Sequence, residues 1–151
     1  MEPLKSLYGW RMTDPILIPV AAGELFDKLQ ILQIKSERIT DAGKLAHVRL
    51  ERAKLDAVAA RLRQDCTDGA LLQQLESGLL AVNRRLWDLE NSVRAFDASS
   101  DFGPAFIASA RQIYAGNDQR AAIKLRINLL LGSAIVEAKE HRSAARDAGA
   151  G

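Results

Sequence analysis

Charged and amide side chains recur at helical spacing in three segments of the chain, inside stripes that are otherwise apolar. In the first segment, Glu24, Lys28 and Lys35 fall between two groups of leucine and isoleucine on a wheel drawn at about 100° per residue. A charge that is buried without a partner is strongly destabilising. These side chains must therefore be paired across the fold or must line a hydrated pocket.

Two later segments carry matching polar groups. One of them places four side chains on a single helix face, at steps of four, three and four residues: Asn83, Trp87, Glu90 and Arg94. The last long segment aligns three more on one face, with Arg111 ahead of them: Asn117, Lys124 and Asn128. Trp87 would supply an apolar surface beside these polar groups.

If the three stripes converge, they form a polar centre suited to a small anionic metabolite. Glu24 and Glu90 are the candidate catalytic groups, because a carboxylate there could act as a general acid or base. The sequence leaves open whether the protein is an enzyme. The predicted ligand-binding residues are Lys28, Lys35, Asn83, Trp87, Arg94, Arg111, Asn117, Lys124 and Asn128.

A metal site is the weaker interpretation of the first stripe. Glu24 and Asp27 lie one helical turn apart, a spacing that could hold Mg²⁺. Lys28 and Lys35 share the stripe and would repel a divalent cation, so we expect no cofactor. One cysteine, Cys66, and two histidines with no local pattern joining them give little support to nucleophilic catalysis or to a zinc site.

Composition excludes several classes of partner. The 151 residues include 21 Lys and Arg against 19 Asp and Glu, so the net charge of +2 does not favour nucleic acid or an anionic membrane surface. The longest apolar stretch, residues 16–22, is far shorter than the ~20 residues that span a bilayer. Because a continuous apolar stretch typical of a signal peptide is also missing, we expect a cytoplasmic protein.

The elements that must position these stripes are predicted to be helices, about five in number, in a compact all-α bundle. Asp68 and Gly69 form a turn between the second and third helices, which we expect to pair antiparallel as a central hairpin. Gly116 and its neighbours are expected to separate the last two helices. The predicted helices cover residues 23–38, the region from Asp41 to about Gln64, 72–96, 105–114 and 119–131.

The ends of the chain are expected to differ from this core. Residues 1–22 contain three of the four prolines, including Pro19, and are predicted to be an extended arm packed on a helical domain of residues 1–142. Residues 143–151 are expected to be a disordered tail. An alternative function is an interaction module, in which the regular apolar seam from Leu72 to Phe96 is shared with a second copy in a homodimer or with another protein.

The segment from Ile18 to Ile39 resembles the opening motif of a bacterial family of small uncharacterised domains, whose pattern is GEL-x-DK-x-x-IL-x-IK-x-x-RI. Further matches extend the resemblance over about residues 16–139. The family has no assigned activity, so the resemblance implies a shared set of polar positions and no reaction. Ala21 stands where the family pattern has a serine that would cap the helix, a loss expected to cost about 1 kcal/mol. His47 replaces asparagine and Asn91 replaces aspartate, which puts a pair of adjacent acids in doubt.

Overall fold

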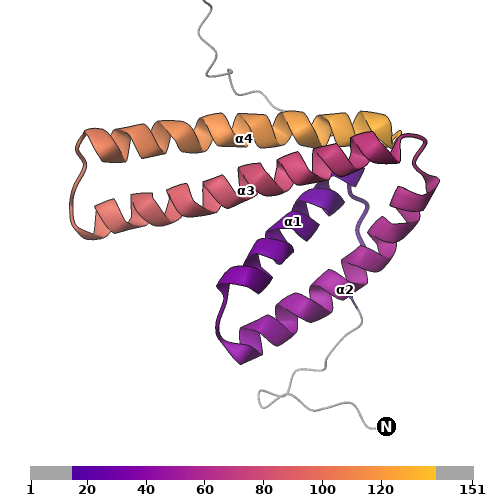
Figure 1. The fold of residues 1–151 in the computed structure, drawn as a ribbon, viewed down its shortest axis with the longest axis horizontal. Helices are drawn as coiled ribbons and strands as arrows, with labels where there is room; N and C mark the ends of the chain where they lie inside the picture. Colours follow the sequence, from indigo (N-terminus) through magenta and orange to yellow (C-terminus); the bar gives the residue numbers. More distant parts are fainter. Residues whose placement is uncertain (1–14, 139–151) are drawn as a thin grey trace, which may run out of the picture.

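The computed structural model describes residues 15–138, which form four α-helices and no β-strand. The helices are α1 (Ala22–Arg38), α2 (Ala42–Asp65), α3 (Gly69–Ala98) and α4 (Pro104–Leu130). Two helical hairpins, α1–α2 and α3–α4, meet at an angle, and α1 lies against one half of the α3–α4 pair (Figure 1). The all-helical prediction is confirmed, with four helices in place of about five. No helix in this region is both long and apolar enough to cross a membrane.

The pairing of α3 differs from the prediction. α3 runs antiparallel to α4 along its length, whereas α2 and α3 contact each other only to a small extent (Figure 1). The reason is that the buried leucines of α3 face α1 and α4 where these helices meet. Leu72, Leu75 and Leu79 are at most 3% exposed and join a core with Phe26 of α1 and Ile127 of α4.

The last long helix is continuous, so the predicted break at residue 116 is wrong. A Gly-Asn-Asp run is typical of a turn between helices, and glycine in a helix interior costs about 1 kcal/mol relative to alanine. In the structure Gly116 is buried against Leu86 of α3, where an added Cβ would lie 2.7 Å from a methyl carbon of that leucine. The glycine therefore serves the close approach of α3 and α4, which compensates for its low helix propensity.

The first turn of α1 is capped by α4. Ala21 occupies the N-cap position and supplies no side-chain acceptor, as its residue type requires. The backbone N–H of Gly23 instead donates to Asn128 Oδ1 at 2.6 Å, and that of Ala22 donates to Ser133 Oγ at 3.2 Å. A Cβ on Gly23 would lie 2.5 Å from the carbonyl oxygen of Lys124, so only glycine allows this approach. The expected loss of a cap is thereby offset by tertiary contacts.

The helix boundaries of the second and third helices follow from local capping. Asp41 and Asp68 each accept a hydrogen bond from the backbone N–H three residues later, at 2.8 and 2.9 Å. At the C-terminal end of α4, Gly132 adopts a φ of 63°. The backbone N–H of Ser133 donates a hydrogen bond to the carbonyl oxygen of Asn128, which ends the helix. The start of α2 beside Asp41 and the end of α4 near residue 131 agree with the sequence-based expectation, whereas α3 begins at Gly69, three residues before its expected start at residue 72.

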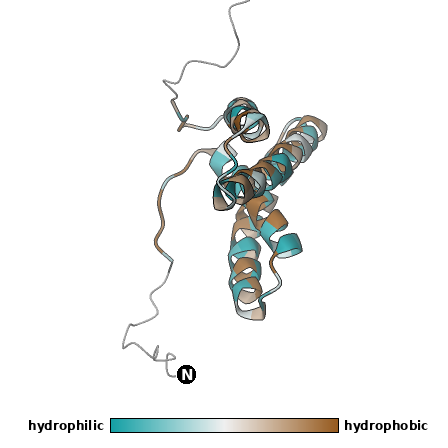
Figure 2. Cartoon of the chain, turned by 90° about the vertical axis from the view of Figure 1, so that its left-hand side faces the viewer, coloured by the Kyte–Doolittle hydropathy of each residue, from teal (hydrophilic) through white to brown (hydrophobic). Residues whose placement is uncertain are grey.

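The part of the N-terminal arm that the structure describes is not packed on the helices. Ile16, Leu17 and Ile18 are 87%, 91% and 70% exposed. Figure 2 shows this segment extending beside the helices without joining them. The expectation of a packed arm is therefore wrong for residues 15–20, whereas residues 1–14 and the predicted tail at 143–151 lie outside the described residues.

Candidate functional site

A buried carboxylate joins three helices at the centre of the molecule. Asp27 of α1 is 2% exposed and accepts a 2.9 Å hydrogen bond from Asn83 Nδ2 of α3. Arg120 of α4 approaches the same carboxylate with Nε and Nη2, the latter 2.7 Å from Oδ2. Such a bidentate contact between an arginine and a carboxylate fixes the orientation of both side chains. Asp27 therefore holds Asn83 and Arg120 in place.

The electrostatics of this cluster keep Arg120 charged. The hydrogen bond to Asp27 raises the pKa of Arg120 above its ordinary value, although burial acts in the opposite direction. In residues 15–138 no fully buried side-chain nitrogen or oxygen lacks a hydrogen-bond partner. The cluster is thus internally satisfied, and its ability to bind anything else depends on the atoms that face outward.

A pocket of about 390 Å³ lies next to this cluster, between α1, α3 and α4. Its buried residues are Ile34, Leu86 and Asn83, and its more exposed ones come mainly from α3. Hollows of this size fall at the lower end of the range of small-molecule sites. We call it the three-helix pocket, and its lining residues are Ile31, Ile34, Asn83, Leu86, Trp87, Glu90, Asn91, Arg94, Asn117 and Arg120.

Two charged residues of the three-helix pocket have no partner in the described part of the chain. Glu90 and Arg94 are exposed and form no ion pair or side-chain hydrogen bond within residues 15–138. Trp87 lies half-buried one turn before them on α3. Asn117 accepts only a long 3.4 Å hydrogen bond from Arg120, which leaves its amide N–H groups available. The pocket therefore offers one free cation, one free anion and amide donors.

Two of the predicted ligand-binding residues lie in a different place. Lys124 is 8% exposed and forms ion pairs with Glu24 of α1 and with Glu137, which follows α4. Burial by itself would lower the pKa of Lys124, but hydrogen bonds to the two carboxylates outweigh it and raise the pKa. Asn128, on the same face, is engaged as the cap of α1. A smaller hollow of about 260 Å³ adjoins these residues.

The other lysine and arginine residues among the predicted ligand-binding residues lie neither in the three-helix pocket nor beside Lys124. Lys28 pairs with Glu51 of α2 at 2.7 Å, and its side chain is 57% exposed. Lys35 is half-buried without an ion pair in the region from 15 to 138, and Arg111 is exposed on α4. The single polar centre expected from the three stripes is therefore divided, because α1 presents neighbouring faces to α2, α3 and α4.

The metal interpretation loses its ligands to these ion pairs. Glu24 is paired with Lys124, and Asp27 is paired with Arg120. Within residues 15–138 no group of three His, Cys, Asp or Glu side chains could hold a metal ion. The two carboxylates are therefore engaged by cations in the positions where a metal would need them.

Some residues of the three-helix pocket were absent from the predicted set. Arg120 is one of them, although it lies one turn after Asn117 and on a similar face. Ile31 and Ile34 belong to the apolar residues beside the charged stripe of the first helix, and they form an apolar wall of the pocket. The helical wheel contained the signal for Arg120, but no local pattern identified Asp27 as its partner.

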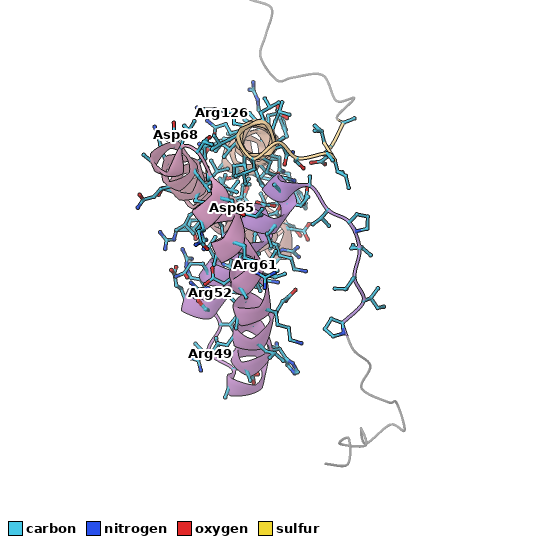
Figure 3. The ribbon with its side chains drawn as sticks, turned by 90° about the vertical axis from the view of Figure 1, so that its right-hand side faces the viewer. Arg49, Arg52, Arg61, Asp65, Asp68 and Arg126 are labelled. Atoms are coloured by element: carbon cyan, nitrogen blue, oxygen red, sulfur yellow. The ribbon has the colours of Figure 1, made fainter. Side chains whose placement is uncertain are left out.

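Other polar features of the surface are internally paired or dispersed. Arg49, Arg52 and Arg61 are exposed along α2 (Figure 3), and acidic residues are interspersed with them. A hollow of about 440 Å³ beside α3 contains Arg63 and Glu76, which bind each other at 2.7 Å. Neither feature presents an unpaired charged group in a pocket of the described residues.

Comparison of the chain with protein-family models, curated proteins and solved structures found no match. The resemblance of the opening motif to a bacterial family stays a prediction. The functional argument therefore depends on the three-helix pocket itself.

Proposed function

We propose that the three-helix pocket binds a small anionic metabolite. The observation that carries the proposal is the unpartnered guanidinium of Arg94 beside an apolar wall in a hollow of about 390 Å³. A guanidinium group recognises carboxylates and phosphates through two parallel hydrogen bonds.

The surroundings of Arg94 support binding in this pocket. Asn117 supplies amide donors, and Trp87, Ile31 and Ile34 supply a surface for the apolar part of a ligand. Arg120 contributes less charge, since Asp27 already neutralises it. Arg94 is therefore the residue on which an anion depends most.

Trp87 provides a direct test. The chain has two tryptophans, Trp10 and Trp87, so Trp10→Phe leaves a single indole, in the pocket. We would titrate this variant with inorganic phosphate, succinate and citrate and follow both its fluorescence and the indole N–H resonance. Saturable binding of at least one anion is expected, and no saturation up to about 10 mM, a free energy weaker than about −3 kcal/mol, overturns the proposal.

A matched pair of arginine variants locates the binding. Arg94→Gln is expected to weaken binding about 10-fold or more, because it removes the charged hydrogen bonds. Arg85→Gln is the control: Arg85 is exposed on the same helix, nine residues earlier and so on the opposite face. Equal loss in both variants would mean that the anion binds to general surface charge and would contradict the assignment.

The alternative, oligomerisation through the apolar seam of α3, has less support. Leu72, Leu75, Leu79 and Leu86 of that seam are at most 7% exposed within one chain. A second copy could use them only if the monomer opened. Light scattering is expected to give the monomer mass of 16.5 kDa, and a stable dimer would favour the alternative.

A further inference from the structure

We infer that the ligand of the three-helix pocket is a zwitterion, of the kind formed by an α-amino acid with an apolar side chain. This inference rests on the proposed function, because the carboxylate of the ligand would bind Arg94 as a simple anion does, and it changes the net charge of the expected ligand from negative to zero. The observation behind it is that Glu90, a free carboxylate, lines the same pocket as the free guanidinium of Arg94.

The charges that line the pocket are balanced. Arg120 is neutralised by Asp27 at 2.7 Å, which leaves one positive group, Arg94, and one negative group, Glu90. An anion without a positive group would gain the attraction of Arg94 and meet the repulsion of Glu90. A ligand that carries an ammonium group beside its carboxylate satisfies both residues.

The spacing of the two residues fits such a ligand. Glu90 and Arg94 are separated by one helical turn, so their Cβ atoms lie about 5–6 Å apart on one face of α3. A glutamate that precedes an arginine by four residues usually favours a mutual ion pair, yet these two form none. Each keeps its hydrogen-bonding groups open, the carboxylate as acceptor and the guanidinium as donor.

The rest of the pocket indicates what the ligand carries besides its charges. Ile31, Ile34 and Leu86 form an apolar wall, and Trp87 lies one turn before the charged pair. An apolar side chain placed against these residues is removed from water, at a gain of about 25 cal/mol per Å². A polar or highly charged substituent would lose its hydration there without a matching partner.

The test compares ligands that share one apolar body and differ in their charged groups. The first set is phenylalanine, 3-phenylpropanoate and 2-phenylethylamine, and the second is leucine, 4-methylpentanoate and 3-methylbutylamine. Each is titrated into Trp10→Phe and followed through the indole N–H resonance of Trp87. We expect one amino acid to bind about 10-fold more tightly than both of its single-charge analogues.

Two variants test whether Glu90 and Arg94 cause the preference for the amino acid. Glu90→Gln is expected to remove most of the advantage of the amino acid over the carboxylate analogue, and Arg94→Gln its advantage over the amine. Asp65→Asn is the control, since Asp65 is exposed on α2, which does not line the pocket. Circular dichroism of each variant establishes that it remains folded.

The possible outcomes separate this inference from the proposed function. Equal binding of the carboxylate analogue and the amino acid overturns the zwitterion and leaves the anion site standing. Tighter binding of the amine than of the amino acid and the carboxylate analogue overturns both the zwitterion inference and the proposed anion site. If neither amino acid binds up to about 10 mM, the inference is wrong, and the titrations with phosphate, succinate and citrate decide the proposed function separately.

Discussion

Asn128 Oδ1 accepts a 2.6 Å hydrogen bond from the backbone N–H of Gly23, although 105 positions separate the two residues in the sequence. The bond is buried and joins the start of α1 to the end of α4. It takes the place of the side-chain cap that Ala21 does not provide. The cap of one helix thereby fixes its position against another.

Loss of this cap should destabilise the fold. Asn128→Ala leaves the buried N–H of Gly23 without an acceptor and is expected to lower the free energy of unfolding by about 1–3 kcal/mol. Urea denaturation followed by circular dichroism measures the change. Asn117→Ala is the control, because this exposed asparagine on the same helix should alter stability by less than about 0.5 kcal/mol. Similar losses in both variants would contradict the capping role.

The pairing of Asp27 with Arg120 predicts a larger loss. Arg120→Met leaves the carboxylate of Asp27 buried with only the hydrogen bond from Asn83, at an expected cost of about 3–5 kcal/mol. Adding Asp27→Asn removes the orphaned charge and keeps an acceptor for Asn83. The double variant should therefore recover at least half of the lost stability, measured by the same denaturation. A double variant as unstable as Arg120→Met would show that the charge is not responsible.

Two helical glycines should respond to alanine in opposite directions. At Gly116 a Cβ would lie 2.7 Å from Leu86, so Gly116→Ala is expected to destabilise by about 1–3 kcal/mol as α3 and α4 are pushed apart. At Gly78 the nearest atom to an added Cβ is 3.6 Å away, an ordinary contact. Gly78→Ala should therefore stabilise by about 0.5–1 kcal/mol through helix propensity. Thermal unfolding of the two variants gives the comparison, and stabilisation of both would contradict the packing argument.

The ion pairs of Lys124 predict a pH dependence at the alkaline end. Because the pKa of Lys124 is raised in the folded state, its charged form favours folding. This contribution is complete below the ordinary value of 10.5 and is lost as the pH rises through the folded-state pKa. The stability difference between the parent and Lys124→Met should therefore stay constant below the ordinary value of 10.5 and shrink as the pH rises above it, as measured by urea denaturation. A difference that stays constant above this value as well would exclude the charge as its source.

The sequence determined the features that depend on neighbouring residues. The caps at Asp41 and Asp68 lie within hydrogen-bonding reach of the helix starts that they define. Likewise, Trp87, Glu90 and Arg94 share a pocket because helical spacing places them on one face of α3. Periodicity and capping act over a few residues, so one sequence contains enough information to predict them.

Only the tertiary structure decided which stripes meet. Lys28 forms an ion pair with Glu51 on α2. Lys124, which was expected in the same site, instead forms ion pairs with Glu24 and Glu137. The arrangement depends on how closely and at what angle the helices approach, which Gly23 permits between α1 and α4 and Gly116 permits between α4 and α3. A helical wheel gives the direction of a side chain from its own helix axis. It contains no information on the distance and angle to another axis, since these follow from packing between residues far apart in the sequence.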